Sequence, residues 1–570
     1  MEVITSEHIR QELENKKLYL LMLAWFIINA LQAYFLGLEG DEAYYWQLSQ
    51  QLDWSYFDHP PMVTLLIRMG EALGHGPLFT RLGTIIITTL SVGVIYKLLP
   101  RSLQQIKWYI LVCASTLLLN VYSFTTTPDA PLLIFAALFL LAYKHFLHKN
   151  TLANTLLMAL AITGMFYSKY HGLLLIIFVV LSNLRLFLNK HFWLAVLFTV
   201  ILFLPHIYWQ YVHDWPSVRF HLNERLAKHY KLNFTTDYLL GQLLVFGPFI
   251  SLLFYATCYK LKIKDKLLRA HLFIFFGTLL FFMLSSFKNT VEAHWTLIAT
   301  PSYISLFMWL IVNGTDKYRK LFQKLAIINI TVILIARILF FIPGSPFLLI
   351  KNYHPFFYGK AWATALYDKA GTTPVLFENS YVLPSLYMYY NKGAKALGYN
   401  TKNYRKSNFN LTDDCTFAGQ PLWYFKRGNE IEDTSLPYIR TKYMPGALIP
   451  IKHYTCVNDL KITHSPIPEI LKAGSSYNIT VTVENKSDRI ITIYDPLKVD
   501  YAFFVAKYDF INSSEDYDIP GNVFHAKEKK TINVHLQAPE NPGKYKILFS
   551  IKNGMLPGNF ASAFFHVTVE

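Results

Sequence analysis

Residues 129–188 decide the fold class; they read DAPLLIFAALFLLAYKHFLHKNTLANTLLMALAITGMFYSKYHGLLLIIFVVLSNLRLFL. The stretch holds three apolar runs, at about 129–147, 151–168 and 172–188. Its charged residues lie at or near the ends of the runs, and these are Asp129, Lys144, Lys149, Lys169 and Arg185. A helix needs roughly 20 mostly apolar residues to cross the hydrocarbon core of a bilayer. The stretch therefore predicts three consecutive membrane-spanning helices joined by short loops.

Eight further apolar runs of comparable length occur, at about 18–38, 79–99, 108–124, 191–209, 237–260, 267–286, 293–313 and 321–342. The composition of the 570 residues agrees, because 53% are hydrophobic and only 16% are charged. Soluble proteins carry ~25% charged residues, so the composition excludes a disordered chain, a fibrous repeat and a wholly soluble enzyme. The first run is long and lacks a small-residue cleavage site, so it is not a cleaved signal. We predict a mainly α fold, a polytopic membrane bundle of about 11 transmembrane helices.

Lysines and arginines concentrate in every second loop between the apolar runs. The residues of these basic loops are Lys97, Arg101, Lys107, Lys144, Lys149, Arg185, Lys190, Lys260, Lys262, Lys264, Lys266, Arg269, Lys317, Arg319, Lys320 and Lys324. Cytoplasmic loops of membrane proteins carry this excess. Lys16 and Lys17 place the N-terminal tail on the same side, so we expect everything after about 343 to lie outside the cytoplasmic membrane. The net charge of +16 would also fit nucleic-acid binding. Its position in short loops explains it better, and we expect no nucleic-acid partner.

The carboxylates of the membrane half show the opposite distribution. Residues 1–340 contain 17 Asp and Glu, and eleven of them fall on the outer side: Glu39, Asp41, Glu42, Asp53, Asp58, Glu71, Asp129, Asp214, Glu224, Asp237 and Glu292. An ionised group beside a span end is costly unless it is paired or serves a function. We therefore expect the chemistry of this protein on the outer face.

The pattern changes after about residue 343. Residues 359–370 and 381–391 read as short helices, and 374–378 and 394–398 as strands, which predicts a small extracytoplasmic α/β region over 343–458. Seven alternating runs separated by Gly, Pro, Asn and Asp then follow, and this spacing is typical of a β-sandwich over 459–570. Residues 1–342 form the predicted transmembrane catalytic domain. Cys415 and Cys456 can pair if their region is extracytoplasmic, whereas Cys113 and Cys258 lie in apolar runs.

The first outer loop is the most unusual stretch, with GDEAYYW at 40–46 and LDWSYFDHPP at 52–61. Two acidic clusters lie within it, each beside a span end. An aromatic belt at the membrane interface with solvated charges is the alternative interpretation. The repetition of acidic residues favours a functional site.

Other outer loops repeat this theme. They contribute TPDAP at 127–131, SKYHG at 168–172, HDWPSVRFHLNER at 213–225 and KNTVEAHW at 288–295. Each loop alone is typical of interfacial anchors or of side chains that reach back to the membrane surface. Together they bring acids, histidines and cations to one face, as a catalytic cleft for an anionic substrate requires. The sequence has no nucleotide-binding or metalloprotease motif, and an outer-face enzyme would need a lipid-linked activated substrate.

These motifs, in this order and on one face, resemble the GT-C glycosyltransferases. The similarity is greatest to the family 39 branch, which contains protein O-mannosyltransferases and lipid A aminoarabinose transferases. It extends from about residue 18 to 310 and weakly, through NSYVLPSLYMYY, to about 408. The β-sandwich lies outside it.

The resemblance implies a GT-C fold and transfer, with inversion, of a sugar from a polyprenyl-phosphate donor. The acceptor would be lipid A, another glycolipid, a polysaccharide or a protein of the envelope. The lipid bilayer would be a further partner, no nucleotide cofactor is expected, and a divalent metal ion is left open. The sequence does not predict the sugar or the oligomeric state.

The resemblance, together with the chemistry of the outer loops, suggests roles for individual residues. Asp41 is the expected catalytic base, with Glu42 and Asp129 as further catalytic candidates. Donor phosphate would be bound by His59, Lys169, Arg225 and Lys288. Other expected residues of the cleft are Tyr44, Tyr45, Arg219, Glu292 and His294, and the expected metal ligands are Asp58 and His221. This chain departs from the aminoarabinose enzymes at His59, where they carry Lys, and at Tyr44, where they carry Arg.

Two other classes of function are alternatives. A membrane transporter or lipid flippase would place ionisable groups near the membrane midplane and often shows internal repeats, whereas here the charges cluster at the outer span ends. An assembly or adhesion protein built around the sandwich would leave the loop carboxylates unexplained.

Overall fold

The computed structural model describes residues 2–221, 230–262, 265–342, 344–428, 435–505 and 510–570. The chain divides into two compact units. The first unit comprises residues 1–218 and 229–357, and the second comprises 219–228 and 358–570.

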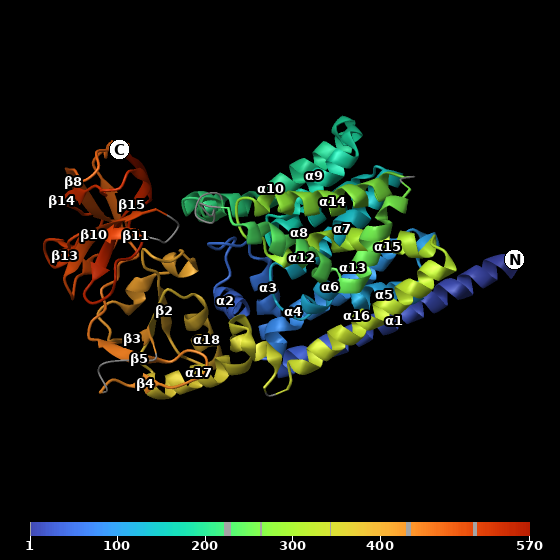
Figure 1. Cartoon of the computed structure of the whole chain (residues 1–570), viewed down its shortest axis with the longest axis horizontal. Coiled ribbons are helices and arrows are strands. Elements are labelled where there is room, and N and C mark those ends of the chain that lie inside the picture. The colour runs from blue at the N-terminus through green and yellow to red at the C-terminus, as the bar shows by residue number, and fades with distance from the viewer. Residues whose placement is uncertain (1, 222–229, 263–264, 343, 429–434, 506–509) are drawn as a thin grey trace. The chain divides into compact units, whose positions relative to one another are not determined.

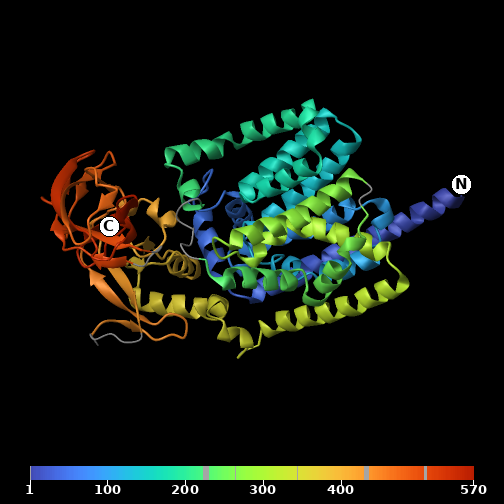
Figure 2. The ribbon, with the colours of Figure 1, turned by 45° about the horizontal axis from the view of Figure 1, so that its top comes forward.

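The first unit is helical, and its long helices lie side by side in a bundle (Figures 1 and 2). Its elements are α1 (Glu2–Phe35), α2 (Gly40–Ser49), α3 (Met62–Glu71), α4 (Pro77–Leu98), α5 (Ile106–Ser115), α6 (Leu117–Val121), α7 (Asp129–His148), α8 (Leu152–Ser168), α9 (Gly172–Ser182), α10 (Lys190–Val212), α11 (Pro216–Arg219), α12 (Leu232–Val245), α13 (Pro248–Thr257), α14 (Lys266–Ser286), η5 (Ala293–Ala299), α15 (Thr300–Val312) and α16 (Asp316–Leu339). The mainly helical, membrane-spanning architecture predicted from the sequence is confirmed.

The number of eleven spans is not confirmed. Seven helices of the described chain are long and apolar enough to cross a membrane, or eight if α12 and α13 form one broken span. That pair bends by 98° at Gly247-Pro248, where Gly247 has a φ of 101° that favours glycine. The predicted span 108–124 is interrupted at Thr116, between α5 and α6. Helix α9 has 11 residues, about half of what a bilayer requires.

Helices α7 and α8 pack closely against each other. A Cβ atom on Gly164 of α8 would lie 2.3 Å from the Phe135 ring of α7. Only glycine therefore fits at this point of the contact. The close packing fixes the end of α7 at Asp129 relative to the end of α8 at Ser168.

The second unit begins with an α/β sheet. Helix α17 (His354–Ala370) precedes β1 (Val375–Glu378), α18 (Val382–Tyr390), β2 (Ala396–Tyr399), β3 (Leu422–Arg427), β4 (Tyr438–Ile439) and β5 (Gly446–Ile451). The strand order is β2-β1-β3-β5-β4, with β1 parallel to both neighbours. The two helices and two strands expected over 359–398 are present.

The β-strands of the C-terminal region form two main sheets. The strands are β6 (Leu460–His464), β7 (Ile470–Leu471), β8 (Ser476–Asn485), β9 (Ile491–Thr492), β10 (Leu497–Phe504), β11 (Phe510–Ser513), β12 (Tyr517–Asp518), β13 (Val523–Phe524), β14 (Lys529–Gln537), β15 (Gly543–Asn553) and β16 (Phe565–Val569). One sheet has the order β11-β10-β15-β16-β7 with β12 beside β10, and the other has the order β14-β8-β6. Their apolar faces share one core, to which Val481, Val534 and Ile547 contribute, so the region is a sandwich.

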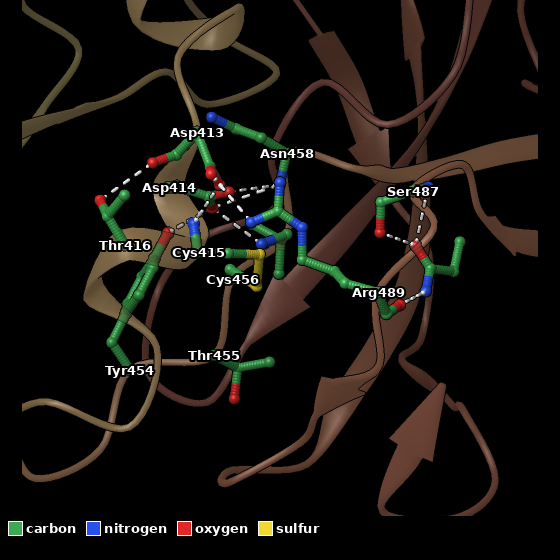
Figure 3. The surroundings of a disulfide bond; sticks show 12 residues. Asp413, Asp414, Cys415, Thr416, Tyr454, Thr455, Cys456, Asn458, Ser487 and Arg489 are labelled. Carbon is green, nitrogen blue, oxygen red and sulfur yellow. Dashed lines mark hydrogen bonds and ion pairs between the residues drawn. A yellow bond between two sulfur atoms is a disulfide. The ribbon is translucent and has the colours of Figure 1, made fainter. Parts of the chain in front are cut away.

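The same core continues into the α/β sheet through Leu376 and Tyr424. The Cys415–Cys456 disulfide lies at this junction (Figure 3). The buried Lys402 ammonium also forms an ion pair with the fully buried Asp500 across it. The pairing of the two cysteines that the sequence left open is thus present in the structure.

Candidate active site

Helix α2 begins with three acidic residues, Glu39, Asp41 and Glu42. Glu39 is the N-cap, and its carboxylate accepts the backbone N–H of Asp41 at 2.7 Å. Glu42 in turn accepts the N–H of Glu39 at 3.0 Å, which completes a capping box. Asp41 therefore lies in the first turn, where the positive end of the helix dipole favours an ionised carboxylate.

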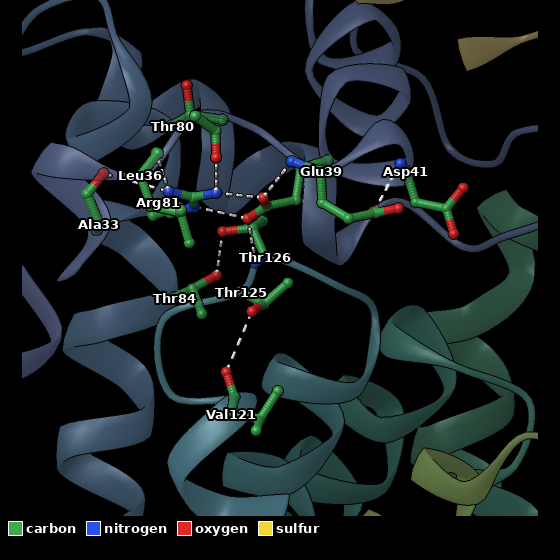
Figure 4. A network of polar contacts seen from close by, with 12 residues as sticks. Ala33, Leu36, Glu39, Asp41, Thr80, Arg81, Thr84, Val121, Thr125 and Thr126 are labelled. Carbon is green, nitrogen blue, oxygen red and sulfur yellow. Dashed lines mark hydrogen bonds and ion pairs between the residues drawn. The ribbon is translucent and has the colours of Figure 1, made fainter. Parts of the chain in front are cut away.

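A buried ion pair holds this turn in place (Figure 4). Arg81 of α4 donates from Nε and Nη2 to the two oxygens of Glu42, at 2.8 and 2.5 Å. The same guanidinium donates to the carbonyls of Ala33, Leu36 and Gly37 at the end of α1. Both side chains are fully buried. Glu42 also accepts the N–H of Thr126 at 2.7 Å, so the pair joins the loop before α2 to the loop before α7.

Glu39 is a second acid of this turn, and its side chain is half-buried. Burial, together with the neighbouring carboxylates of Asp41 and Glu42, raises the pKa of the Glu39 carboxyl well above its ordinary value. Three carboxyl groups within four residues repel one another when all are ionised. The turn therefore places Glu39, whose ionised form is disfavoured, next to the half-buried Asp41.

Asp129 and Lys169 form the second charged centre. Asp129 is the first residue of α7, and Lys169 follows α8. The Lys169 Nζ lies 2.8 Å from each carboxylate oxygen of Asp129, and both residues are buried. His294 of η5 adds a third group, with its Nε2 3.7 Å from Asp129 Oδ2. Three loops that are far apart in the sequence thus meet at one carboxylate.

Tyr122, which follows α6, links these two centres. Its hydroxyl interacts electrostatically with the carboxylates of Asp129, Glu39 and Glu292. Its ring lies 5.3 Å from the ring of His294. The acidic turn of α2 and the Asp129–Lys169 pair therefore belong to one cluster of polar side chains.

The second half of the first outer loop contributes Asp58. This carboxylate is buried and accepts a long hydrogen bond, 3.5 Å, from the Tyr44 hydroxyl. It also interacts electrostatically with Tyr170, the residue after Lys169, and burial raises the pKa of the Tyr170 hydroxyl to about 12. Tyr170 is therefore a neutral hydrogen-bond donor at physiological pH. The rings of Tyr45 and His59 lie against each other, with centroids 5.7 Å apart.

The chain is similar to several known proteins. Residues 58–209 match the family model described as dolichyl-phosphate-mannose-protein mannosyltransferase. The chain is 25% identical over 410 residues to the lipid A galacturonosyltransferase RgtD of Rhizobium johnstonii, and the match covers 66% of this chain and 84% of that protein. It is also similar in structure to ArnT from Cupriavidus metallidurans, in the apo state (TM-score 0.56, 13% identity) and bound to undecaprenyl phosphate (TM-score 0.55, 14% identity). Both similarities cover 75% of this chain and 97% of ArnT.

The chain is a membrane glycosyltransferase with the GT-C fold. The enzyme class and fold expected from the loop motifs are confirmed. The transporter and adhesion alternatives are not supported by these relatives.

In this glycosyltransferase the predicted site residues divide into several groups. The first unit brings together Asp41, Glu42, Asp129, Lys169, Glu292 and His294 through the contacts above, and it places Asp58 with Tyr44 and Tyr170. Lys288, after α14, and Glu292 are exposed. Arg219 and His221 belong to the second unit, and Arg225 lies outside the described residues.

The two predicted metal ligands, Asp58 and His221, belong to different units. Asp58 belongs to no group of three or more possible ligands among the described residues. The group that does occur in the described chain combines Asp414, Cys415 and Cys456, and its two sulfurs form a disulfide, which removes them as thiolate ligands. This group therefore does not fit a metal ion.

Three residues of the glycosyltransferase site were not expected from the sequence. Arg81 lies within an apolar run, where a single arginine carries no signal of its partner 39 residues away. Tyr122 is one of 38 tyrosines. Glu39 belongs to the outer carboxylates, but nothing in its spacing distinguishes it from its neighbours.

Proposed function

We propose that this glycosyltransferase moves a sugar from a polyprenyl-phosphate carrier to an envelope acceptor on the outer face of the cytoplasmic membrane. The observation that supports the proposal is the Tyr122 hydroxyl, which interacts electrostatically both with Glu39 of the acidic turn that contains Asp41 and with Asp129 of the Asp129–Lys169 pair. Undecaprenyl phosphate bound to the structural relative ArnT supports the class of donor. The lipid A transferase RgtD supports lipid A as the first acceptor to test, before other glycolipids, polysaccharides and proteins.

The donor half of the reaction needs a positive group near the leaving phosphate. The Lys169 ammonium donates two hydrogen bonds to the carboxylate oxygens of Asp129. An ammonium has three N–H donors, so one remains for a phosphate oxygen. The buried position strengthens this interaction, because the local dielectric is low. Asp129 thus holds the ammonium in place, and His294 supplies a further donor beside it.

The acceptor half needs a base when the acceptor is a hydroxyl. The acceptor oxygen forms a bond to the anomeric carbon, and the bond from that carbon to the phosphate oxygen breaks. The electron pair leaves with the polyprenyl phosphate, and Asp41 takes the proton of the acceptor hydroxyl. Attack opposite the leaving group inverts the anomeric centre.

Glu42 has a different role in this proposal. Its oxygens accept from Arg81, Glu39 and Thr126, so it is saturated with donors and buried. We assign it to positioning of Asp41 rather than to proton transfer. No step requires a metal ion or a nucleotide.

The orientation belongs to the same proposal. The cations of alternate loops place the N-terminus in the cytoplasm, which puts the acidic cluster and the second unit outside. The Cys415–Cys456 disulfide supports this, since disulfides persist in oxidising compartments.

The test is transfer by the purified protein in lipid nanodiscs, with polyprenyl-phosphate sugar as donor and lipid A as acceptor. Asp41→Asn keeps the shape of the side chain but removes the base, and we expect kcat to fall roughly 10²- to 10⁴-fold. Asp237→Asn is the matched control, because Asp237 is an exposed acid of α12 in the same unit, and it should keep wild-type transfer. Near-normal transfer by Asp41→Asn with an unchanged melting temperature would contradict the assigned base.

A further inference from the structure

A hollow lies on the second unit, at the junction of the α/β sheet with the sandwich. It has a volume of about 260 Å³, and its lining residues come from two parts of the chain: Pro450, Ile451, Lys452 and Tyr454 after β5, and Asp495, Asn553, Gly554, Met555 and Leu556 from the sandwich. Its volume lies just below the roughly 300–1,000 Å³ of pockets for drug-sized ligands. A single six-membered ring with its substituents is the kind of group that suits this size.

The floor of the hollow is apolar and its rim is polar. Ile451, Tyr454 and Leu556 are buried beneath it. Lys452 and Asp495, which also line the hollow, are exposed. Within the described chain neither of their charged groups makes a hydrogen bond or ion pair with another side chain, so the fold does not require them.

The walls are held in a fixed position. The backbone carbonyl of Thr455 accepts a hydrogen bond from Asn553 Nδ2 at 2.7 Å. The side-chain hydroxyl of Thr455 accepts a hydrogen bond from the backbone N–H of Tyr494 at 3.0 Å. The hydroxyl of Tyr454 donates to Asp414 at 3.0 Å, and the Cys415–Cys456 disulfide lies beside it (Figure 3). A preformed site of this kind loses little conformational entropy when a ligand binds.

We propose that this hollow binds one sugar ring of the acceptor glycan, an inference that rests on the proposed function. The C–H face of a pyranose packs on the apolar floor. The Asp495 carboxylate accepts hydrogen bonds from two neighbouring hydroxyls, and the Lys452 ammonium donates to a third oxygen. The second unit thus selects the acceptor, while the chemistry stays in the first unit.

The experiment measures binding without transfer. The full chain in nanodiscs, free of sugar-based detergents, is probed by saturation-transfer NMR with the methyl pyranosides of glucose, galactose, mannose and galacturonic acid. We expect at least one of them to bind. Binding should weaken about tenfold in Asp495→Ala and in Lys452→Ala, as loss of a charged hydrogen bond predicts.

Two control variants separate this inference from the proposed function. Asp518→Ala removes an exposed acid elsewhere on the sandwich and should bind as wild type. Asp41→Asn should also keep the NMR signal even though transfer is lost, because the hollow is not the reaction site. The inference is overturned if no pyranoside binds, if binding is insensitive to Asp495→Ala and Lys452→Ala, or if Asp41→Asn abolishes it.

Discussion

The carboxylates of the two units accept different numbers of hydrogen bonds. In the second unit, Asp414 accepts from the Tyr454 hydroxyl and from the N–H groups of Val457 and Asn458. In the first unit, Asp129 meets one ammonium and, at 3.7 Å, one imidazole. A carboxylate whose lone pairs are all used stabilises a fold, whereas one with remaining capacity can serve a substrate. The number of donors around an acid, more than its burial, distinguishes the two roles.

Glu42 tests this comparison most strongly. It lies in the first unit, but its carboxylate accepts as many hydrogen bonds as that of Asp414. Arg81→Met should leave the Glu42 carboxylate buried without its cation and three carbonyls without a donor. Breaking such a buried pair costs roughly 3–5 kcal/mol, so we expect a large fall in melting temperature, measured by intrinsic fluorescence in nanodiscs.

A double variant sharpens this prediction. Adding Glu42→Gln to Arg81→Met removes the uncompensated charge and should recover part of the lost stability. If Arg81→Met melts like wild type but has lost transfer, the pair belongs to the chemistry, and saturation with donors is not a guide to role.

The sequence predicts this pair only in part, and the reason is physical. Periodicity and charge placement locate Glu42 at an outer span end, but a contact between residues 42 and 81 depends on how α2 and α4 pack. The same limit applies to the spans. Thr116 and Gly247-Pro248 interrupt apolar runs whose hydropathy is continuous, and α8 and α9 are shorter than the runs that contain them. The eleven runs therefore correspond to seven or eight helices of sufficient length in the described chain.

The acidic motifs themselves were predictable because ionised groups beside a membrane are rare. Placement beside span ends predicts Asp129, Lys169 and His294 as site residues, and the family resemblance adds the role of Asp41. The structure brings Asp129, Lys169 and His294 together. Tyr122 cannot be predicted in this way, since tyrosine is common at membrane interfaces. The α/β region and the sandwich were predictable from alternation and turn residues, but the core they share was not.

The Cys415–Cys456 disulfide provides a second test, which concerns the stability of the second unit. It closes a loop with a sequence separation of 41 residues, and removing a disulfide of this kind costs about 2–4 kcal/mol. We expect Cys415→Ser combined with Cys456→Ser to lower the melting temperature while kcat of the folded protein stays the same. A reducing agent should reproduce the shift in the wild type and have no effect on the double variant. A loss of kcat at full stability would mean that the second unit takes part in the reaction.

Asp414 gives the smallest effect and the most specific one, because it is a change in pH dependence. Burial raises the pKa of its carboxyl to about 6, although hydrogen bonds from Val457, Tyr454 and Asn458 oppose the shift. The unfolded chain has a pKa near 3.9 at this residue. Between these values the folded state holds a proton that the unfolded state has released, so stability falls as pH rises from about 4 to about 6, by roughly 3 kcal/mol.

The side chain introduced by Asp414→Asn cannot titrate. The free energy of unfolding of this variant should therefore lack the fall that the wild type shows between pH 4 and pH 6. Asp488→Asn is the matched control, because Asp488 is an exposed acid of the same unit, and its curve should parallel that of the wild type. Melting temperatures measured from pH 4 to pH 7 decide the point. If Asp414→Asn keeps the wild-type slope, the donors around Asp414 outweigh its burial, and a saturated carboxylate in this unit is ionised at no cost. The comparison between the two units would then hold for hydrogen bonding but not for charge.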